Sequence, residues 1–310
     1  MTTADAALAT RPRNLLTLGD LPPADLDHLV ARGAVMAERV AAGDPELAGV
    51  LRGRVAGIYF TRTSTRTRTA FSSAALRLGS GLISYGPGDL QVNTGETIAD
   101  TGRVLSGMLD LLVVRTAGPV AEMAALAAHP RMAVVNAMSA EEHPTQALAD
   151  LTTLQRHFGR VDGLRVLYVG EGNNTATALT LALNRYPAAE LHLRTPPGYG
   201  LPPGFPHVNE RHDMDDLPAD VDVVYTTRWQ TTGTTKPDPD WRDVFAPFRV
   251  DDDLLARWPD AIFLHDLPAH RGEEVTASVL DGPRSLAFAQ AENKLYSAMA
   301  VLEWAGGARW

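Results

Sequence analysis

The chain has 310 residues, of which 45% are hydrophobic and 21% are charged, and its formal net charge is −9. One hydrophobic core stops growing at roughly 250–300 residues, so the length favours two domains. The sequence has no cysteine, which excludes a disulfide scaffold, a thiolate nucleophile and a cysteine–zinc site. The negative net charge argues against a protein that binds nucleic acid through bulk charge.

Two further features of the composition concern location and charge type. The longest apolar runs fall far short of the roughly 20 residues that a membrane-spanning helix needs, and no basic-then-apolar signal pattern opens the chain. We therefore expect a cytoplasmic protein with no membrane partner. Of the 28 basic residues only Lys236 and Lys294 are lysines. Arginine suits a two-pronged grip on phosphate or carboxylate, although biased codon usage is the simpler explanation.

The predicted elements alternate between helices and strands along the chain. In the first half, helices are predicted over residues 20–42, 66–78, 96–106, 117–128 and 144–157, and strands over residues 54–60, 81–85, 110–115 and 132–136. In the second half, strands are predicted over residues 164–170, 190–194, 222–226 and 261–265, and helices over residues 174–185 and 291–305. Segments 195–217 and 230–247 are rich in Pro, Gly or polar residues and are predicted as loops.

Strands that alternate with helices of this length indicate an α/β fold with parallel sheets covered on both faces. The alternation forms two blocks, and the helix over residues 144–157 lies between them. We therefore expect two doubly wound parallel-sheet domains joined by a bridging helix.

The first motif with chemical content is FTRTSTRTRTAF over residues 60–71, which follows a predicted strand and opens a predicted helix. A helix N-terminus offers unpaired N–H groups and the positive end of the helix dipole, and both attract anions. Ser64, Thr65 and Thr67 add hydroxyl donors, and Arg66 adds a guanidinium that can hold phosphate with two hydrogen bonds. The motif predicts a phosphate site.

The second motif is EHPTQALAD over residues 142–150. Pro144 suits the first turn of a helix, so His143 precedes that turn and Gln146 lies within it. Both side chains can point from the same helix start. A neutral imidazole and an amide suit a carbonyl and an amine rather than a second phosphate. Taken alone, a histidine at such a position is more often structural than catalytic.

The third motif is LHDLPAHR over residues 264–271, at the end of a predicted strand. Ligands of open parallel sheets bind outside the carboxyl ends of the strands, where this loop is expected. The carbonyl of Leu267, before Pro268, can accept a hydrogen bond from an amine.

Together these motifs resemble the aspartate/ornithine carbamoyltransferase family, and the resemblance covers nearly the whole chain in order. Further matching segments are residues 89–105 (DLQVNTGETIADTGRVL), Arg115, residues 169–174 (VGEGNN) and residues 289–294 (AQAENK). Each segment is a weak signal alone, and their shared order and spacing make the set specific. Residues 265–275 and the AEN segment are more similar to the ornithine branch.

The resemblance implies an enzyme that takes its carbamoyl group from carbamoyl phosphate, with no cofactor, no metal and no covalent intermediate. It implies that the donor is held by Ser64, Thr65, Arg66, Thr67, Gln91, Arg115, His143, Gln146, Leu267 and Lys294. Among these, Arg66, Arg115 and His143 would be catalytic. The carbamoyl oxygen would be stabilised by Arg115, His143 and the hydroxyl of Thr67.

The resemblance also carries an expected organisation. Residues 1–148 plus 289–310 would form the carbamoyl-phosphate domain, with the C-terminal helix returning to it, and residues 149–288 would form the acceptor domain. Gln91 resembles the residue that family members lend to the active site of a neighbouring subunit. The implied assembly is a homotrimer with its sites at subunit interfaces.

The acceptor side departs from the ornithine pattern. Ornithine enzymes carry Asp-x-Trp-x-Ser-Met-Gly, which holds the α-amine of the amino acid, where this chain has TRWQTTG over residues 227–233. Thr227 therefore replaces a carboxylate. Arg228 and Gln230 follow it and resemble the aspartate branch, in which this pair holds the carboxylates of the acceptor.

Two further departures and one retained feature complete the comparison with the ornithine pattern. Asp266 replaces the cysteine of His-Cys-Leu-Pro, and Lys294 replaces the arginine of Ala-Glu-Asn-Arg. Asn173 and Asn174 are retained, and the resemblance implies that they help to hold the carboxylate of the acceptor.

We interpret these changes as a carboxylate moved from position 227 to position 266 and a guanidinium gained at position 228. Asp266 would pair with a cationic amine or accept a proton from the attacking amine as a catalytic base. The expected acceptor is an amine-bearing amino acid other than ornithine, such as a shorter diamino acid or a natural-product precursor. Two alternatives stay open: an ornithine carbamoyltransferase of arginine metabolism, and a non-catalytic relative that binds carbamoyl phosphate or an amino acid without turnover.

Overall fold

A computed structural model describes residues 13–205, 208–230 and 235–307. The chain divides into two compact units, one formed by Met1–Thr152 with Asn293–Trp310 and the other by Thr153–Glu292. The divisions fall inside two helices, α6 (Pro144–Phe158) and α11 (Ala287–Ala305). Within the described ranges, no helix is both long enough and apolar enough to cross a membrane.

The first unit is built on a four-stranded parallel sheet in the order β2-β1-β3-β4. Its strands are β1 (Val55–Phe60), β2 (Gly81–Tyr85), β3 (Leu111–Arg115) and β4 (Ala133–Met138). Every residue of β3 and β4 is buried, as expected for apolar, β-branched strands in a sheet covered on both faces.

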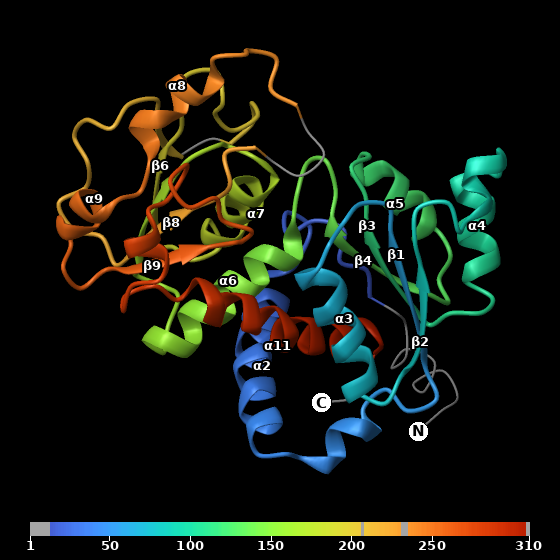
Figure 1. The fold of residues 1–310 in the computed structure, drawn as a ribbon. Coiled ribbons are helices and arrows are strands. Elements are labelled where there is room, and N and C mark those ends of the chain that lie inside the picture. Colours follow the sequence, from blue (N-terminus) through green and yellow to red (C-terminus); the bar gives the residue numbers. More distant parts are fainter. Residues whose placement is uncertain (1–12, 206–207, 231–234, 308–310) are drawn as a thin grey trace. The chain divides into compact units, whose positions relative to one another are not determined.

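Helices cover both faces of this sheet. α3 (Arg66–Arg77) and α4 (Ile98–Leu105) lie on opposite sides of it (Figure 1), and α5 (Val120–Leu126) packs with α4. Leu105, Met123 and Leu126 of α4 and α5 form one buried cluster with Leu112 and Val114 of β3.

The other elements of the first unit include the helix α2 (Pro23–Ala41) and two 3-10 helices, η1 (Pro45–Gly49) and η2 (Gln91–Thr94). α11 belongs to this unit from Asn293 onward. It is fixed to α2 by a two-pronged ion pair, in which Arg32 Nε and Nη2 lie 2.6 and 2.8 Å from the carboxylate oxygens of Glu303.

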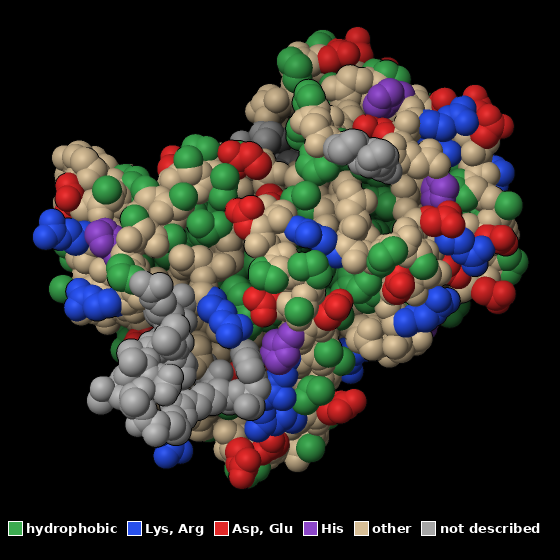
Figure 2. Space-filling model, turned by 180° about the vertical axis from the view of Figure 1, so that it is seen from behind, with side chains coloured by type: hydrophobic (Ala, Val, Ile, Leu, Met, Phe, Trp, Pro, Cys, Tyr) green, Lys and Arg blue, Asp and Glu red, His purple; other side chains and the backbone are tan. Residues whose placement is uncertain are grey.

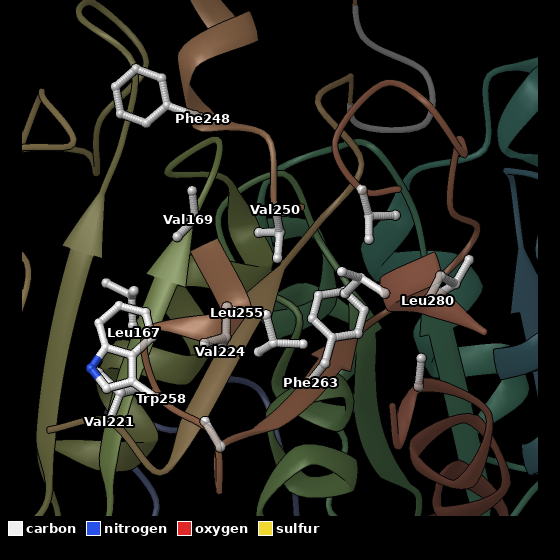
Figure 3. Close-up of a cluster of buried hydrophobic side chains, with 14 residues drawn as sticks. Leu167, Val169, Val221, Val224, Phe248, Val250, Leu255, Trp258, Phe263 and Leu280 are labelled. Atoms are coloured by element: carbon white, nitrogen blue, oxygen red, sulfur yellow. The ribbon is translucent and has the colours of Figure 1, made fainter. Parts of the chain in front are cut away.

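The second unit is built on a five-stranded parallel sheet in the order β7-β6-β5-β8-β9. Its strands are β5 (Arg165–Val169), β6 (Glu190–Arg194), β7 (Asn209–Arg211), β8 (Val223–Thr226) and β9 (Ile262–His265), and α7 (Asn174–Leu183) connects β5 to β6. A buried apolar cluster packs β5, β8 and β9 against residues 248–258 (Figure 3), with Leu167, Val224, Phe263 and Trp258 among its members.

The structure corrects two predicted loops of the second unit. The strand β7 lies within segment 195–217. The helix α8 (Trp241–Phe245) lies within segment 230–247, and η3 (Ala246–Phe248) begins in it and ends one residue beyond it. Residues 231–234 of this segment are outside the described ranges. β7 is short and polar and pairs only with β6 at the sheet edge. α8 is held by buried aromatic packing, so neither element has a periodic sequence pattern that would reveal it.

Smaller corrections concern element ends and short helices. α11 begins at Ala287, before the predicted start at residue 291, and α5 begins at Val120 rather than residue 117. Two short helices, α9 (Asp252–Ala256) and α10 (Ala277–Leu280), were not predicted.

On the face drawn in Figure 2, acidic and basic side chains are interspersed, so no single-sign field accompanies the net charge of −9 there.

Candidate active site

The first unit gathers its polar side chains at the carboxyl ends of β1 and β3. β2 and β3 are the two neighbours of β1 in the sheet. The chain passes from β1 to β2 and then back across β1 to β3, so the strand order reverses between β1 and β3. Ligands of open α/β sheets bind at such a reversal point. The Ser/Thr/Arg motif follows β1, and Arg115 is the last residue of β3.

The N-terminus of α3 is suited to bind an anion. Arg66 is its first residue and Thr65 its N-cap, and within the described structure no side chain caps this helix by a hydrogen bond to its first turn. The N–H groups of an uncapped first turn point at the space before the helix, where phosphate oxygens are stabilised. Ser64 and Thr65 immediately precede that turn, and Thr67 is buried within it.

Arg115 lies between the phosphate motif and the histidine motif. Its Nη1 is 3.4 Å from Thr67 Oγ1 and 3.2 Å from His143 Nε2. A guanidinium can only donate, so His143 Nε2 accepts in this contact and the neutral ring carries its proton on Nδ1. The structure thus brings together a hydroxyl, a guanidinium and an imidazole from three separate segments.

His143 is held in its neutral form. Its side chain is buried, and that burial lowers the pKa of the imidazole well below its ordinary value. The positive charges of Arg115, Lys294 and Arg66 lower the pKa further, because each opposes a second positive charge nearby. A neutral imidazole can hold an oxygen or a nitrogen of a carbamoyl group without repelling the surrounding cations.

Gln146 has its amide orientation fixed by two buried neighbours. Its Nε2 donates to Asp150 Oδ1 at 2.7 Å, and its Oε1 accepts a hydrogen bond from Lys294 Nζ. The acceptor end of the amide therefore faces Lys294. Sequence reasoning missed Asp150, although it lies one helical turn after Gln146, at the i,i+4 spacing that places two side chains on one face of a helix.

Gln91 has a different setting from the other predicted donor residues. It is exposed in η2, and its Oε1 accepts a hydrogen bond from Thr94 Oγ1 at 2.7 Å. Its assignment to the site of a neighbouring subunit stays a prediction.

The second unit has its own polar cluster at the carboxyl ends of its strands. Asp266 follows β9, and its carboxylate accepts two hydroxyl hydrogen bonds, from Thr175 Oγ1 to Oδ2 at 3.0 Å and from Thr227 Oγ1 to Oδ1 at 3.0 Å. Thr175 lies in the first turn of α7, and Thr227 follows β8. Sequence reasoning named Asp266 and Thr227 and missed Thr175, which directly follows Asn173 and Asn174.

Asn173 is the N-cap of α7. Its Oδ1 accepts from the backbone N–H groups of Thr175 at 2.9 Å and Ala176 at 3.2 Å. Its side-chain oxygen is thus engaged with the helix, as is typical of an Asn N-cap. The predicted contact of Asn173 with a carboxylate of the acceptor would therefore use its amide nitrogen as the donor. Asn174 follows it as the first residue of α7 and is buried.

Arg228 and Gln230 flank Trp229, which is buried against the rings of Trp241 and Phe245. This aromatic packing fixes the backbone between the two predicted acceptor residues. Among the described residues, no partner accepts a hydrogen bond from the buried Nε of Arg228. A guanidinium is suited to a carboxylate, and the assignment of Arg228 to the acceptor stays a prediction.

Lys236 joins this aromatic cluster to the turn that precedes α7. Its Nζ pairs with Glu171 Oε1 at 2.6 Å and lies 4.4 Å from the ring centre of Tyr199 and 4.5 Å from that of Phe245. Burial lowers the pKa of Lys236, and the hydrogen bond to Glu171 opposes that lowering. Sequence reasoning noted this lysine for its rarity and gave it no role.

Comparison with known proteins places both halves of the chain in one family. Residues 13–156 match the description "Aspartate/ornithine carbamoyltransferase, carbamoyl-P binding domain", and residues 162–305 match "Aspartate/ornithine carbamoyltransferase, Asp/Orn binding domain". The two matched segments follow one another and together account for nearly the whole chain.

Whole-chain relatives agree with this result. An ornithine carbamoyltransferase of Thermosynechococcus vestitus is 37% identical over 304 residues, which are 94% of this chain and 95% of the relative. One of Parafrankia sp. is 41% identical over 269 residues, 82% of this chain and 84% of the relative. The solved ornithine carbamoyltransferase of Pyrococcus furiosus has a TM-score of 0.88 at 35% identity and covers 94% of this chain and 96% of its own.

The fold, the two polar clusters and these similarities define an α/β enzyme of the carbamoyltransferase class. The chain belongs to the aspartate/ornithine carbamoyltransferase family. The similar proteins named above are ornithine carbamoyltransferases, which supports the ornithine alternative better than the expected new acceptor.

Proposed function

We propose that this chain transfers the carbamoyl group of carbamoyl phosphate to a side-chain amine of a diamino acid, with ornithine as the first candidate acceptor. The observation that carries the donor half is the position of Arg115, with Nη1 3.4 Å from Thr67 Oγ1 and 3.2 Å from the neutral His143. The guanidinium of Arg115 is thus a fixed positive charge between Thr67 of the phosphate motif and the imidazole of His143, which suits a carbonyl.

The donor would bind with its phosphate at the N-terminus of α3, on Ser64, Thr65, Arg66 and Thr67. The carbamoyl oxygen would lie at Arg115 and His143. The carbamoyl nitrogen would donate to Gln146 Oε1, whose direction is set by Asp150. Lys294 Nζ donates to Gln146 Oε1 in this structure, and its positive charge would also stabilise the bound donor.

The reaction needs positioning and charge stabilisation rather than a covalent intermediate. The neutral amine forms a C–N bond to the carbamoyl carbon, and negative charge develops on the carbamoyl oxygen beside Arg115. The C–O bond to phosphate then breaks, phosphate leaves on the side of Arg66, and the amine nitrogen gives up one proton. The products are an ureido amino acid and phosphate.

Ornithine is supported by the relatives and by the contact between Asp266 and Thr227. The family pattern of ornithine enzymes has a carboxylate at position 227, where it holds the α-amine. This chain has that carboxylate at position 266 instead, within 3.0 Å of the Thr227 hydroxyl. A cationic α-amine would therefore still meet one carboxylate at this cluster.

A second candidate acceptor is a diamino acid of different chain length, such as a natural-product precursor. It is favoured by the displaced carboxylate, which changes the residue that would hold the amine, and by Arg228 and Gln230, which resemble the aspartate branch. Asp266 would act here as a binding charge or as the base that accepts the proton of the attacking amine.

An acceptor panel distinguishes the two candidates. Purified enzyme is given carbamoyl phosphate with ornithine, aspartate, 2,3-diaminopropionate or 2,4-diaminobutyrate, and phosphate release is measured at several acceptor concentrations. Saturable turnover that is highest with ornithine supports the first candidate, and a higher kcat/KM with a shorter diamino acid supports the second. Phosphate release no faster than without acceptor, for every amine, contradicts the proposed transfer.

The phosphate assignment has a matched control on the same helix. Arg66→Ala removes the guanidinium at the first residue of α3 and should abolish donor binding in a calorimetric titration with carbamoyl phosphate. Arg77→Ala removes an exposed arginine from the last turn of α3 and should leave donor binding unchanged. Equal effects of the two substitutions would contradict a phosphate site at the start of the helix.

We also propose that the active enzyme is a homotrimer in which Gln91 of one subunit completes the donor site of the next. Its exposure in η2 supports this, because a buried side chain could not reach another chain. Light scattering measures the assembly. Mixing inactive Gln91→Ala and Arg66→Ala proteins should restore part of the activity if the sites are shared, and no restoration would contradict shared sites.

A further inference from the structure

The loop that carries Asp266 and Leu267 rests on two fully buried side chains, His265 and Glu274. His265 Nδ1 accepts the backbone N–H of Leu267 at 2.8 Å. A backbone N–H can only donate, so Nδ1 is unprotonated and the proton of the neutral ring is on Nε2. Nε2 then donates to Glu274 Oε1 at 3.2 Å. Glu274 thereby fixes the tautomer through which His265 holds Leu267.

Glu274 also holds the far end of the same loop. Its Oε1 accepts the backbone N–H of His270. At the near end, the backbone N–H of His265 donates to Gln290 Oε1 at 2.9 Å. The loop from His265 to His270 is therefore fixed at both ends by buried groups, and the side chains of Asp266 and Leu267 lie between those ends.

Leu267 needs such support because of its backbone conformation. Its φ is 53°, in the left-handed region that a bulky side chain rarely adopts. Residues in such conformations persist only where the surroundings determine them from several sides. The hydrogen bond from Leu267 N–H to His265 is one such determinant.

The burial of Glu274 is costly for the fold, which calls for an explanation. The side chain is fully buried, and among the described residues no partner is present for its Oε2. A buried carboxylate with an unsatisfied oxygen lowers stability relative to an apolar side chain of similar size. Positioning of the loop is a role that an apolar residue could not perform.

We propose that His265 and Glu274 are positioning residues for the acceptor, which hold Asp266 and the carbonyl of Leu267 in the arrangement that carbamoyl transfer uses. The proposal rests on the function proposed above. Neither residue touches a substrate in this account, because His265 acts through its contact with the Leu267 N–H and Glu274 acts through His265. The threonine hydroxyls of Thr175 and Thr227 direct the Asp266 carboxylate, and the His265–Glu274 pair fixes the backbone beneath it.

Two substitutions, each of which keeps one of the two polar contacts of the imidazole, separate positioning from mere core stability. His265→Asn keeps an acceptor oxygen near the place of Nδ1 and loses the group that meets Glu274. His265→Gln keeps a donor near the place of Nε2 and loses the group that meets Leu267. Both substitutions break one buried hydrogen bond of the pair, so the two proteins should melt at similarly lowered temperatures. His192→Gln is the control, because His192 makes an exposed contact with Glu190 at 3.1 Å on β6.

The first readout needs no activity. Hydrogen exchange is followed in overlapping peptides that cover residues 262–272, so that the Leu267 amide is separated from its neighbours. The Leu267 amide should exchange about tenfold faster or more in His265→Gln than in His265→Asn, since one buried hydrogen bond is worth about a factor of ten. Equal exchange in the two variants would contradict the assigned contact.

The second readout is turnover. His265→Gln should lower kcat/KM for the acceptor about tenfold relative to His265→Asn. Losses that follow melting temperature alone would show a structural role and overturn the proposal. If the wild-type protein turns over no acceptor, the proposed function fails, and the exchange comparison still decides whether His265 fixes Leu267.

Discussion

Thr227 donates its hydroxyl hydrogen to Asp266 Oδ1 at 3.0 Å, so two of the positions at which this chain departs from the ornithine pattern contact each other. The two changes are therefore coupled. A carboxylate that leaves position 227 and one that arrives at position 266 occupy the same small cluster. The charge available to a cationic acceptor is retained, and its position is changed.

The coupling predicts how substitutions at these two positions combine. Thr227→Asp alone would place two carboxylates in contact, and these repel each other when both are ionised. Acceptor kcat/KM should fall about tenfold or more. The double change Thr227→Asp with Asp266→Cys should recover ornithine use to or above the wild-type level. Steady-state kinetics of the single and double variants check this, and additive losses would contradict the coupling.

The neutral state of His143 predicts the pH dependence of stability. Burial and the neighbouring cations lower its pKa in the folded protein, while the unfolded chain takes up a proton below about pH 6.5. Because the unfolded state then binds more protons, His143 lowers the free energy of unfolding as pH falls below about 6.5. Urea unfolding at several pH values should show this loss in the wild type and a smaller one in His143→Gln. If the free energies of unfolding of the wild type and His143→Gln changed equally with pH, the neutral state of His143 would be contradicted.

Asp150 is expected to act on donor binding through Gln146. Asp150→Ala removes the acceptor that fixes the Gln146 amide at 2.7 Å, which is worth about 1–3 kcal/mol for a buried partner of this kind. The KM for carbamoyl phosphate should rise about tenfold, whereas Asp150→Asn, which keeps an acceptor oxygen, should cost less. Kinetics at saturating acceptor measure the effect, and an unchanged donor KM in Asp150→Ala would disprove the role.

Lys236 is expected to stabilise the second unit. Lys236→Met removes the pair with Glu171 at 2.6 Å and the contacts of the cation with the faces of Tyr199 and Phe245. Because Glu171 retains some contact with solvent, the expected loss is about 1–3 kcal/mol, below that of a fully buried pair. Urea unfolding gives the value, and Lys236→Arg should lose less. A midpoint unchanged in Lys236→Met would show that the pair contributes nothing.

The sequence predicts the apolar strands, including β2, β4 and β9 at sheet edges, and misses the polar edge strand β7. Apart from Arg115 and Asn136, the residues of β3 and β4 are apolar, as is typical of strands that a parallel sheet buries on both faces, so their pattern is local and readable. β7 has three polar residues and exists because β6 offers it an edge, and α8 exists because its aromatic side chains pack with Trp229. Both depend on partners distant in sequence.

The residues of the candidate site also differ in whether a local sequence pattern reveals them. Arg115, His143 and Asp266 stand in motifs and could be named from the chain alone. Asp150, Thr175 and Glu274 act by holding those residues, through contacts such as the 3.0 Å hydrogen bond from Thr175 to Asp266, which joins residues 91 positions apart. The i,i+4 spacing from Gln146 is a local signal for Asp150, whereas no local pattern marks Thr175 or Glu274, whose contacts emerge only from the structure.

The most direct test follows the carbamoyl carbon itself. Carbamoyl phosphate labelled with carbon-13 is mixed with the enzyme and ornithine, and the label is followed by carbon NMR, with Asp266→Asn as the comparison. The account predicts that the label appears in an ureido carbon of the amino acid, with phosphate released in equal amount, and that Asp266→Asn forms this product more slowly at the same donor affinity. Label that appears only in the products of spontaneous decomposition, for ornithine and for the shorter diamino acids alike, would contradict carbamoyl transfer by this chain.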